Sequence, residues 1–275
     1  MAGFGLTVVR HGETRYNKEK ILQGQGVDEP LSNTGFKQAE AAGVFLSNVK
    51  FTHVFESDLI RAKQTAAKIL EKNKYCKDII TKYDAKLRER KYGVAEGRPL
   101  SDLRAMAKAA GEQCPSFTPS GGETLAEVRV RGKDFFEFLC QLVFEVHRKE
   151  KTDVSTVANG LEASEGYSVN PFANCCNGPV LNSDSKRVNE VLDANILVVS
   201  HGAYMKNWIG YFVSDLECTL PSSLTKSQLS SVSPNTGISH FIIKLENGGD
   251  IIKPRISCIG LNRDDHLASV NDKKA

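Results

Sequence analysis

Two short apolar runs in this sequence each end near a histidine that is followed by glycine. Residues 6–9 lead directly into Arg10 and His11, and residues 196–199 lead, one residue later, to His201. A neutral imidazole nitrogen can attack phosphorus, and a guanidinium can hold two phosphate oxygens in a planar fork. If the two runs are neighbouring parallel strands, both rings emerge at the same edge of the sheet. The pattern therefore predicts a site for phosphoryl transfer.

Two further charged side chains can complete such a site. Arg61 is predicted in the first turn of a helix, where unpaired backbone N–H groups attract anions. Glu89 lies between Arg88 and Arg90, whose charges favour an ionised carboxylate. A bound phosphate dianion would instead favour the protonated form that a general acid needs. The residues alone leave open which of these two effects prevails.

Apolar periodicity indicates the elements that must position these side chains. Strands and helices are predicted to alternate, which is typical of an α/β domain with helical layers around a mostly parallel sheet. In such sheets, ligands gather beyond the carboxyl ends of the strands. The predicted strands cover residues 6–9, 53–55, 79–83, 196–199, 239–245 and 251–256, and the predicted helices cover residues 34–46, 59–71, 100–110, 124–146 and 203–213.

Polar residues at the ends of these segments predict how several of them begin or turn. Asn33 or Thr34 is expected to cap the first helix, and Ser57 or Asp58 the second. The Asn-Gly-Gly run at residues 247–249 is typical of a hairpin that joins the last two strands.

The whole chain, residues 1–275, is interpreted as one domain with an insertion at about residues 149–193. That stretch is rich in Asn, Ser and Gly and shows no sustained period, so a flexible, loosely folded surface segment is expected. The polar tail after Leu261 is expected to fray.

Composition limits the class of protein. The chain has 275 residues, 40% of them hydrophobic, which is enough for a substantial core. A formal net charge of +3 is too small to indicate nucleic acid as a partner, and no apolar run is long enough to be an integral membrane segment. The N-terminal residues lack the charged-then-apolar order of a secretory signal, which predicts a cytoplasmic protein.

Cysteine and acidic residues argue against a metal or disulfide framework. The seven cysteines are odd in number and include no CxxC pair, so reduced thiols are expected. Asp264, Asp265 and His266 form the nearest approach to a metal-binding run and are interpreted as solvated surface. No metal or other cofactor is therefore expected.

The motifs taken in order resemble those of the histidine phosphatase superfamily, also called the phosphoglycerate-mutase-like family. They occur in the family's order over most of the first 240 residues, whereas the insertion matches poorly and receives no assignment. The matching positions are Arg-His-Gly-Glu-Thr at 10–14, Asn17, Pro-Leu-Ser at 30–32, Gly35, Ser-Asp at 57–58, Arg61, Leu-Arg-Glu at 87–89, Gly-Gly-Glu-Thr at 121–124 and Ser-His-Gly at 200–202.

The resemblance implies a three-layer α/β/α fold and a metal-independent, two-step hydrolysis of a small phosphorylated metabolite. His11 is expected to attack phosphorus and become phosphohistidine, while Arg10, Arg61 and His201 hold the non-bridging oxygens. Glu89 is expected to protonate the leaving oxygen and then activate water. The cations around His11 should lower its pKa, and its second nitrogen should donate to a carbonyl.

The expected substrate is fructose 2,6-bisphosphate, which this resemblance suggests is cleaved at the 2-position. Four residues are expected to contact the substrate: Asn17, Gln23, Gly24 and Tyr92. A second phosphate needs further cations, and six occur in suitable segments: Lys18, Lys20, Arg88, Arg90, Lys91 and Arg98. The resemblance also allows the nucleus and the mitochondrion as locations, and it identifies no protein partner.

Three alternatives remain open at this level. A phosphoglycerate or bisphosphoglycerate mutase or phosphatase would use the same residues, and a mutase would return the phosphate to its product. A broad-specificity acid phosphatase would use Glu13 or Glu123 as its acid. A regulatory interaction module would keep the fold without the activity, although the retention of every catalytic residue type argues against it.

Overall fold

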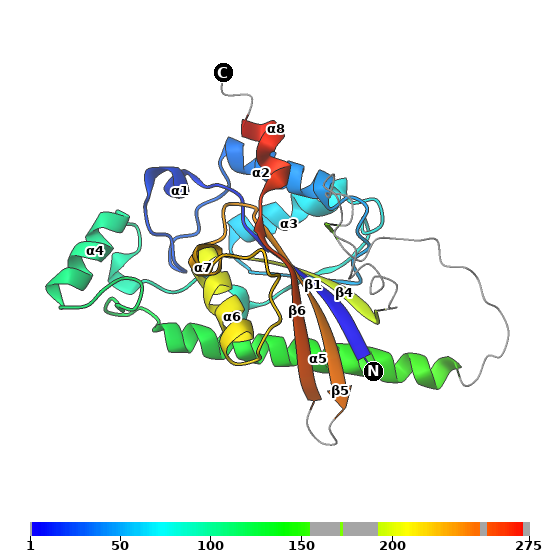
Figure 1. Ribbon diagram of the computed structural model, residues 1–275. Coiled ribbons are helices and arrows are strands. Elements are labelled where there is room, and N and C mark those ends of the chain that lie inside the picture. The colour runs from blue at the N-terminus through cyan, green and yellow to red at the C-terminus, as the bar shows by residue number, and fades with distance from the viewer. Residues whose placement is uncertain (1, 155–170, 173–191, 248–251, 272–275) are drawn as a thin grey trace.

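The computed structural model describes residues 2–154, 171–172, 192–247 and 252–271. Within these residues, the chain forms one six-stranded sheet of order β3-β2-β4-β1-β5-β6 with helices on both faces (Figure 1). The strands are β1 (Ala2–Arg10), β2 (His53–Glu56), β3 (Thr81–Tyr83), β4 (Ala194–Ser200), β5 (Ile238–Asn247) and β6 (Ile252–Arg263). The helices are α1 (Arg15–Glu19), α2 (Asn33–Phe45), α3 (Ile60–Lys72), α4 (Leu100–Ala109), α5 (Leu125–Val154), α6 (Gly202–Ser214), α7 (Lys226–Ser230) and α8 (Ala268–Asn271).

The central strands are buried on both faces, and their side chains alternate between two cores. Leu6 and Val8 of β1 join a hydrophobic cluster that includes residues of α5 and α6, whereas Val9 joins a second cluster with residues of α2 and α3. Figure 1 shows the long helix α5 on one side of the sheet and α2 and α3 on the other. The expected three-layer fold with a mostly parallel sheet is therefore confirmed, and β5 and β6 extend it through antiparallel pairing.

Strand pairing brings the two predicted histidines to one edge of the sheet. β1 and β4 pair in parallel with Arg10 opposite Ser200, so His11 and His201 follow at the same level. β2 pairs in parallel with β4 and ends at Glu56, which places the start of α3 near them. β5 runs antiparallel to β1, so its first residue lies at this edge as well. The expectation that both rings emerge together is confirmed, because their centroids lie 5.1 Å apart.

Helix α2 begins one residue earlier than predicted because Ser32 is its cap, so the predicted caps Asn33 and Thr34 were wrong. The Ser32 hydroxyl accepts a hydrogen bond from the Gly35 N–H at 3.0 Å. A hydroxyl at this position reaches an N–H of the first turn that has no partner within the helix. Asn33 and Thr34 lie inside that turn and cannot take the same role.

The N-terminus of α3 is satisfied from a different loop, so the predicted caps Ser57 and Asp58 were also wrong. Ile60, the first residue of α3, donates its N–H to Asp28 Oδ1 at 2.7 Å. Asp58 instead binds the Arg88 guanidinium through both carboxylate oxygens, at 2.7 and 2.6 Å. A long-range carboxylate therefore supplies the acceptor that the sequence appeared to offer locally.

Two elements, α5 and β6, are longer than predicted, and the tail that follows β6 is better ordered than predicted. α5 continues to Val154, well past its predicted end, and β6 continues to Arg263. The expectation of a frayed tail after Leu261 was wrong as far as residue 271. Leu267 is buried there, and His266 Nε2 lies 3.0 Å from the Thr236 hydroxyl. Leu267 and His266 therefore hold this otherwise polar C-terminal segment against the rest of the fold.

Part of the predicted insertion and of the predicted hairpin lies outside the described residues, as do Cys175 and Cys176. Within the insertion, Phe172 is buried and its ring packs 6.0 Å from that of Phe45. The described cysteines carry free thiols, and all of them except Cys114 are buried. None of the described helices has both the length and the apolar character needed to cross a membrane.

We expect Phe135→Ala to lower the free energy of unfolding by about 3–5 kcal/mol, the usual loss for a buried aromatic ring. Phe135 is fully buried on α5, and its ring packs 5.7 Å from Trp208. Urea unfolding followed by the fluorescence of Trp208, the single tryptophan, measures the loss. Phe138→Ala on the same helix is the control, because Phe138 is 40% exposed and should lose only about 1 kcal/mol. Equal losses would contradict this account of the core.

Candidate active site

A cavity of about 290 Å³ opens at the carboxyl edge of the sheet, beside the ends of β1 and β4. His201 lies fully buried behind its wall, with its ring 5.1 Å from that of His11. The other residues that the sequence predicted for the site line the cavity itself: Arg10, His11, Asn17, Gln23, Gly24, Arg61, Glu89 and Tyr92.

The His11 ring is fixed in one tautomer. Its Nδ1 lies 2.7 Å from the Gly12 carbonyl oxygen, which can only accept a hydrogen bond. Nδ1 therefore carries the proton, and Nε2 keeps its lone pair. Burial, followed by the charges of Arg61 and Arg10, lowers the pKa of His11 well below its ordinary value. Both expectations for this ring are met, although burial rather than charge is the largest cause of the lowered pKa.

His201 has the opposite tautomer. Arg61 Nε donates to His201 Nδ1 at 3.2 Å, so Nδ1 accepts and the proton lies on Nε2. Burial, followed by the charge of Arg61, lowers the pKa of His201 well below its ordinary value, and the ring is neutral. Its Nε2 is buried and has no hydrogen-bond partner among the described residues. A buried donor in this position is suited to an oxygen of a bound anion.

Arg61 is fully buried and Arg10 half-buried, and both donate to neutral carbonyl oxygens. Arg61 donates through Nη2 to Gly24 at 2.8 Å and through Nη1 to Val27 at 3.2 Å, and Arg10 donates through Nη1 to Ser233 at 2.7 Å. Arg10 Nε is a second buried atom without a partner in the described part of the chain. Burial lowers the pKa of Arg61 to about 10, so its guanidinium stays charged at neutral pH. The carbonyls accept these hydrogen bonds without cancelling the charge, and the counter-charge of Asp28 Oδ1 lies 3.8 Å from Arg61 Nη1.

The Glu89 carboxylate lies at the N-terminus of helix α6. Its Oε1 accepts from the backbone N–H groups of Arg90 at 2.8 Å and Tyr204 at 2.9 Å, and its Oε2 accepts from that of Ala203 at 3.1 Å. The free N–H groups of a helix start stabilise a carboxylate there. The start of α6, at Gly202 and Ala203, also lines the cavity, so the carboxylate is held at its wall.

The predicted substrate-binding residues before α2 are held by short polar contacts. Asn17 Oδ1 accepts from the Thr14 N–H at 3.1 Å, and Gln23 Oε1 accepts from the Thr14 hydroxyl at 3.0 Å. Because both amide oxygens already accept hydrogen bonds, the NH₂ groups are what these side chains can offer an anion. Gly24 adopts a φ of +58°, and a Cβ there would lie 2.1 Å from the Glu96 carboxylate. Another residue here would strain the backbone and displace the Glu96 carboxylate, so glycine is favoured at this position.

Tyr92 lines the cavity next to Arg90, which hydrogen-bonds to the backbone of the fold. Burial, followed by the charge of a nearby carboxylate, raises the pKa of the Tyr92 hydroxyl, which remains a neutral donor. The Arg90 guanidinium lies 5.3 Å from the centre of the Tyr92 ring. Arg90 is buried and donates to the carbonyl oxygens of Pro115, Phe117 and Glu123. Arg90, one of the six cations available for a second phosphate, is therefore engaged by the fold instead.

The other cations predicted for a second phosphate differ in their placement. Lys20 lines the cavity. Arg88 does not serve there, because it forms a bidentate pair with Asp58. On the described lining of the cavity, three of the predicted cations do not occur: Lys18, Lys91 and Arg98.

The alternative general acids are engaged away from the cavity. Glu13 Oε1 accepts from the Ser32 hydroxyl at 2.9 Å, and Glu123 forms a bidentate pair with Arg131 at 2.9 and 3.0 Å. Neither carboxylate is part of the described lining, whereas Glu89 is. Across the described residues, no three His, Cys, Asp or Glu side chains are grouped so that they could hold a metal ion.

The loop that precedes β5 also contacts the site, although it was not among the predicted site residues. Asn235 Nδ2 donates to the backbone oxygen of His11 and to Asn17 Oδ1, both at 3.1 Å, and Val232 lines the cavity. The available signal was the polar run Ser-Pro-Asn-Thr-Gly at residues 233–237. A strand that pairs antiparallel with β1 must begin where β1 ends, so this run had to lie near the histidines.

Known proteins match this chain over its full length. A bovine protein named fructose-2,6-bisphosphatase TIGAR is 58% identical over 272 residues, covering 98% of this chain and 99% of its own. The protein of the same name from Xenopus laevis is 59% identical over 272 residues, covering 98% and 97%. A solved phosphoglycerate mutase from Bacillus anthracis has a TM-score of 0.63 at 19% identity, covering 98% of this chain and 97% of that one, which shows the shared fold.

A family model matches the part of the chain that contains most of the residues lining the cavity. The model of the histidine phosphatase superfamily (branch 1) matches residues 6–160. This segment contains His11, Arg61 and Glu89, which line the cavity. The chain therefore belongs to the histidine phosphatase superfamily.

Proposed function

We propose that this protein is a fructose-2,6-bisphosphatase that removes the 2-phosphate through a phosphohistidine on His11. The observation that carries the proposal is the state of the two rings. His11 is neutral with Nε2 unprotonated, and His201 beside it offers a buried N–H from its own Nε2. The relatives named fructose-2,6-bisphosphatase, at 58% and 59% identity over nearly the whole chain, support the choice of substrate.

In the first step, the His11 Nε2 lone pair forms a bond to phosphorus as the bond from phosphorus to the sugar oxygen breaks. Glu89 in its protonated form gives its proton to that oxygen, so the sugar leaves as an alcohol and Glu89 becomes a carboxylate. Arg10, Arg61 and His201 donate to the three non-bridging oxygens, where charge is concentrated in the transition state.

In the second step, water replaces the sugar. The Glu89 carboxylate takes one proton from the water as its oxygen attacks phosphorus, and the bond to His11 Nε2 breaks. The products are inorganic phosphate, a neutral His11 and a protonated Glu89, so the starting state is restored. Every group in this cycle belongs to the chain, and each of its residues already lies in or directly behind the cavity.

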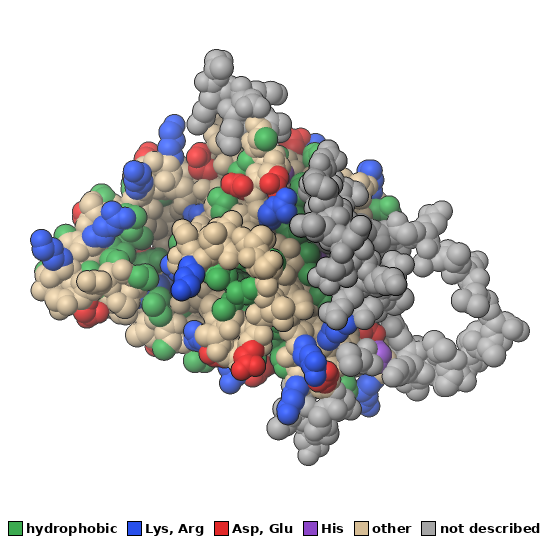
Figure 2. All heavy atoms as spheres, viewed as in Figure 1, with side chains coloured by type: hydrophobic (Ala, Val, Ile, Leu, Met, Phe, Trp, Pro, Cys, Tyr) green, Lys and Arg blue, Asp and Glu red, His purple; other side chains and the backbone are tan. Residues whose placement is uncertain are grey.

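The cavity also offers a place for the second phosphate of a bisphosphorylated sugar. Lys20 lines the cavity along with Tyr16 and Asn17. In Figure 2, Lys and Arg side chains gather over α1 and α4 at the left of the molecule. A local concentration of cations attracts anions even when the net charge of the whole chain is only +3.

The proposal predicts that the protein releases phosphate from fructose 2,6-bisphosphate and that His11→Ala removes at least about 10⁴-fold of the activity, since no other group forms the covalent intermediate. Released phosphate and fructose 6-phosphate are measured together. The control is incubation with 3-phosphoglycerate and 2,3-bisphosphoglycerate. Fast isomerisation of these glycerates with little free phosphate would instead identify a mutase.

The lowered pKa of His11 predicts a pH effect. Removing the Arg61 charge removes one cause of the lowered pKa, so the pKa of His11 should rise in Arg61→Gln. Because the neutral ring is the nucleophile, the acidic limb of the kcat/KM profile should move to higher pH. Arg61→Lys is the matched control. It retains the charge and should lose about 10²–10³-fold in rate, as Arg61→Gln does, without the shift of the acidic limb. Identical profiles for the two variants would contradict the electrostatic explanation.

Lys20 is expected to determine the preference for a substrate with two phosphates. Lys20→Gln keeps a polar side chain, one atom shorter, but removes its charge, so KM for fructose 2,6-bisphosphate should rise about tenfold. KM for a sugar carrying a single phosphate should stay within about twofold, because the clamp around His11 is unchanged. Lys18→Gln is the control, since this neighbouring lysine is absent from the described lining of the cavity. A similar rise in KM for both substrates would argue against a second-phosphate role for Lys20.

A further inference from the structure

The segment that carries Glu89 has little regular structure of its own. A single 3₁₀ turn spans Ala85–Leu87 and another spans Gly93–Ala95, and between them the backbone forms neither helix nor strand. Carbonyl groups in such a segment need partners from elsewhere. A general acid must nevertheless be placed to within a fraction of an ångström of the leaving oxygen.

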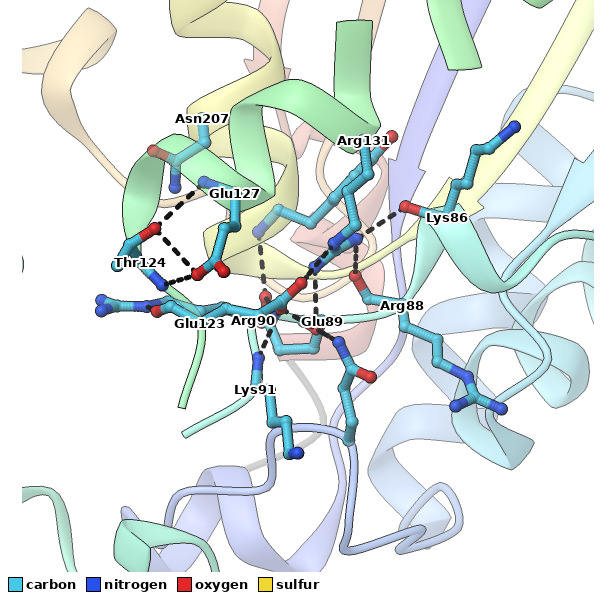
Figure 3. Close-up of polar contacts among 12 residues, drawn as sticks. Lys86, Arg88, Glu89, Arg90, Lys91, Glu123, Thr124, Glu127, Arg131 and Asn207 are labelled. Atoms are coloured by element: carbon cyan, nitrogen blue, oxygen red, sulfur yellow. Dashed lines mark hydrogen bonds and ion pairs between the residues drawn. The ribbon is translucent and has the colours of Figure 1, made fainter. Parts of the chain in front are cut away.

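Arg131 of α5 supplies those partners. Its Nη1 donates to the carbonyl oxygens of Lys86 at 2.6 Å and Arg88 at 2.7 Å, and its Nη2 donates to that of Glu89 at 3.0 Å. Nε and Nη2 bind the two oxygens of the Glu123 carboxylate at 2.9 and 3.0 Å. Figure 3 shows this guanidinium between the 86–89 backbone and Glu123. A guanidinium has five N–H donors in a rigid plane, and all five are used here.

Glu123 fixes the guanidinium from the other side. Its Oε2 also accepts from the Lys91 backbone N–H at 2.8 Å and from Gln25 Nε2 at 3.0 Å. Gln25 Nε2 in turn donates to the Glu89 carbonyl at 2.8 Å. Arg131 and Glu123 therefore hydrogen-bond to the backbone on both sides of Glu89. Gln25 connects this segment to the loop that carries the cavity residue Gly24.

The pair formed by Arg131 and Glu123 is largely shielded from water, and it also contacts a residue that binds the Glu89 carboxylate. The side chains of Arg131 and Glu123 are only 14% and 19% exposed, so screening of their charges is weak. The Arg131 guanidinium also lies 4.9 Å from the centre of the buried Tyr204 ring. Tyr204 donates its backbone N–H to Glu89 Oε1, so one arginine contacts both the backbone of the acid and a residue that holds its side chain.

We propose that Arg131, oriented by Glu123, is a positioning residue that places the Glu89 carboxylate against the leaving oxygen without touching the substrate. The inference rests on the proposed function, because it assumes that Glu89 is the general acid. Lysine cannot replace this arginine, since an ammonium group cannot reach three carbonyls and a carboxylate in one plane. The chain thus uses a residue of α5, outside the described lining of the cavity, to set the rate of proton transfer.

The test compares substrates that differ in their need for an acid. The sugar oxygen of fructose 2,6-bisphosphate needs a proton as it leaves, whereas the nitrophenolate of p-nitrophenyl phosphate is a weak base and leaves without one. Arg131→Lys should lower kcat/KM for fructose 2,6-bisphosphate about 30–100-fold and that for p-nitrophenyl phosphate less than about threefold. Arg129→Lys is the matched control: this arginine lies two positions earlier on α5 and pairs with Asp215, so both activities should stay within about twofold. Equal losses on the two substrates in Arg131→Lys would overturn the proposal.

Two further measurements separate the possible failures. Glu89→Gln should show the same difference between substrates, and adding Arg131→Lys to it should cost less than about threefold more, since no acid remains to be positioned. If Glu89→Gln affects both substrates equally, the acid assignment of the proposed function fails. If it discriminates but the double variant shows additive losses, the positioning role alone fails. Should Arg131→Lys not fold, Glu123→Gln keeps the guanidinium and is expected to show the same selectivity with a loss of about 3–10-fold.

Discussion

The constraint on which this site depends is the placement of two arginines, Arg61 fully buried and Arg10 half-buried, whose hydrogen bonds go to neutral acceptors. The Asp28 carboxylate lies 3.8 Å from Arg61 Nη1, farther than a hydrogen bond. Arg10 and Arg61 donate to carbonyl oxygens, which satisfy their N–H groups but carry no net charge. Arg88, Arg129 and Arg131 elsewhere in the molecule form close pairs with carboxylates. Burying a charge that is only partly compensated is unfavourable, so a phosphate dianion that enters the cavity relieves that penalty. The same two charges add to the effect of burial in keeping both imidazoles unprotonated.

The fold meets this constraint by ending several elements at one place. Parallel pairing of β1 with β4 fixes the two histidines at the same level, and the neighbouring β2 leads into the helix that carries Arg61. These positions are rigid because strands buried on both faces cannot shift without disturbing two cores. Glu89 lies instead in an irregular segment, so its placement depends on hydrogen bonds from other elements. The site thus combines groups positioned by packing with one group positioned by polar contacts.

This division explains how far the sequence could predict the site. His11 and His201 were predictable because a buried strand followed by His-Gly is a local pattern, and all nine predicted site residues do lie in or directly behind one cavity. The caps of α2 and α3 and the loop contact of Asn235 were not predictable, because the tertiary structure determines which residues they contact. Asn235 lies 224 positions from the His11 carbonyl that it binds, and Asp28 lies 32 positions from Ile60. Local propensity contains no information about such pairs.

Arginine shows most clearly what the sequence leaves undetermined. Arg88 and Arg90 flank Glu89 and were among the cations available for a second phosphate, yet Arg88 binds Asp58 and Arg90 binds three carbonyls. An irregular backbone segment has acceptors to satisfy, and a long forked donor is the side chain best able to reach them. The cations nearest to the acid in sequence are thereby used by the fold. Anion binding is then determined by which arginines line the cavity, as Arg10 and Arg61 do, and this depends on the three-dimensional placement of each guanidinium rather than on the number of basic residues.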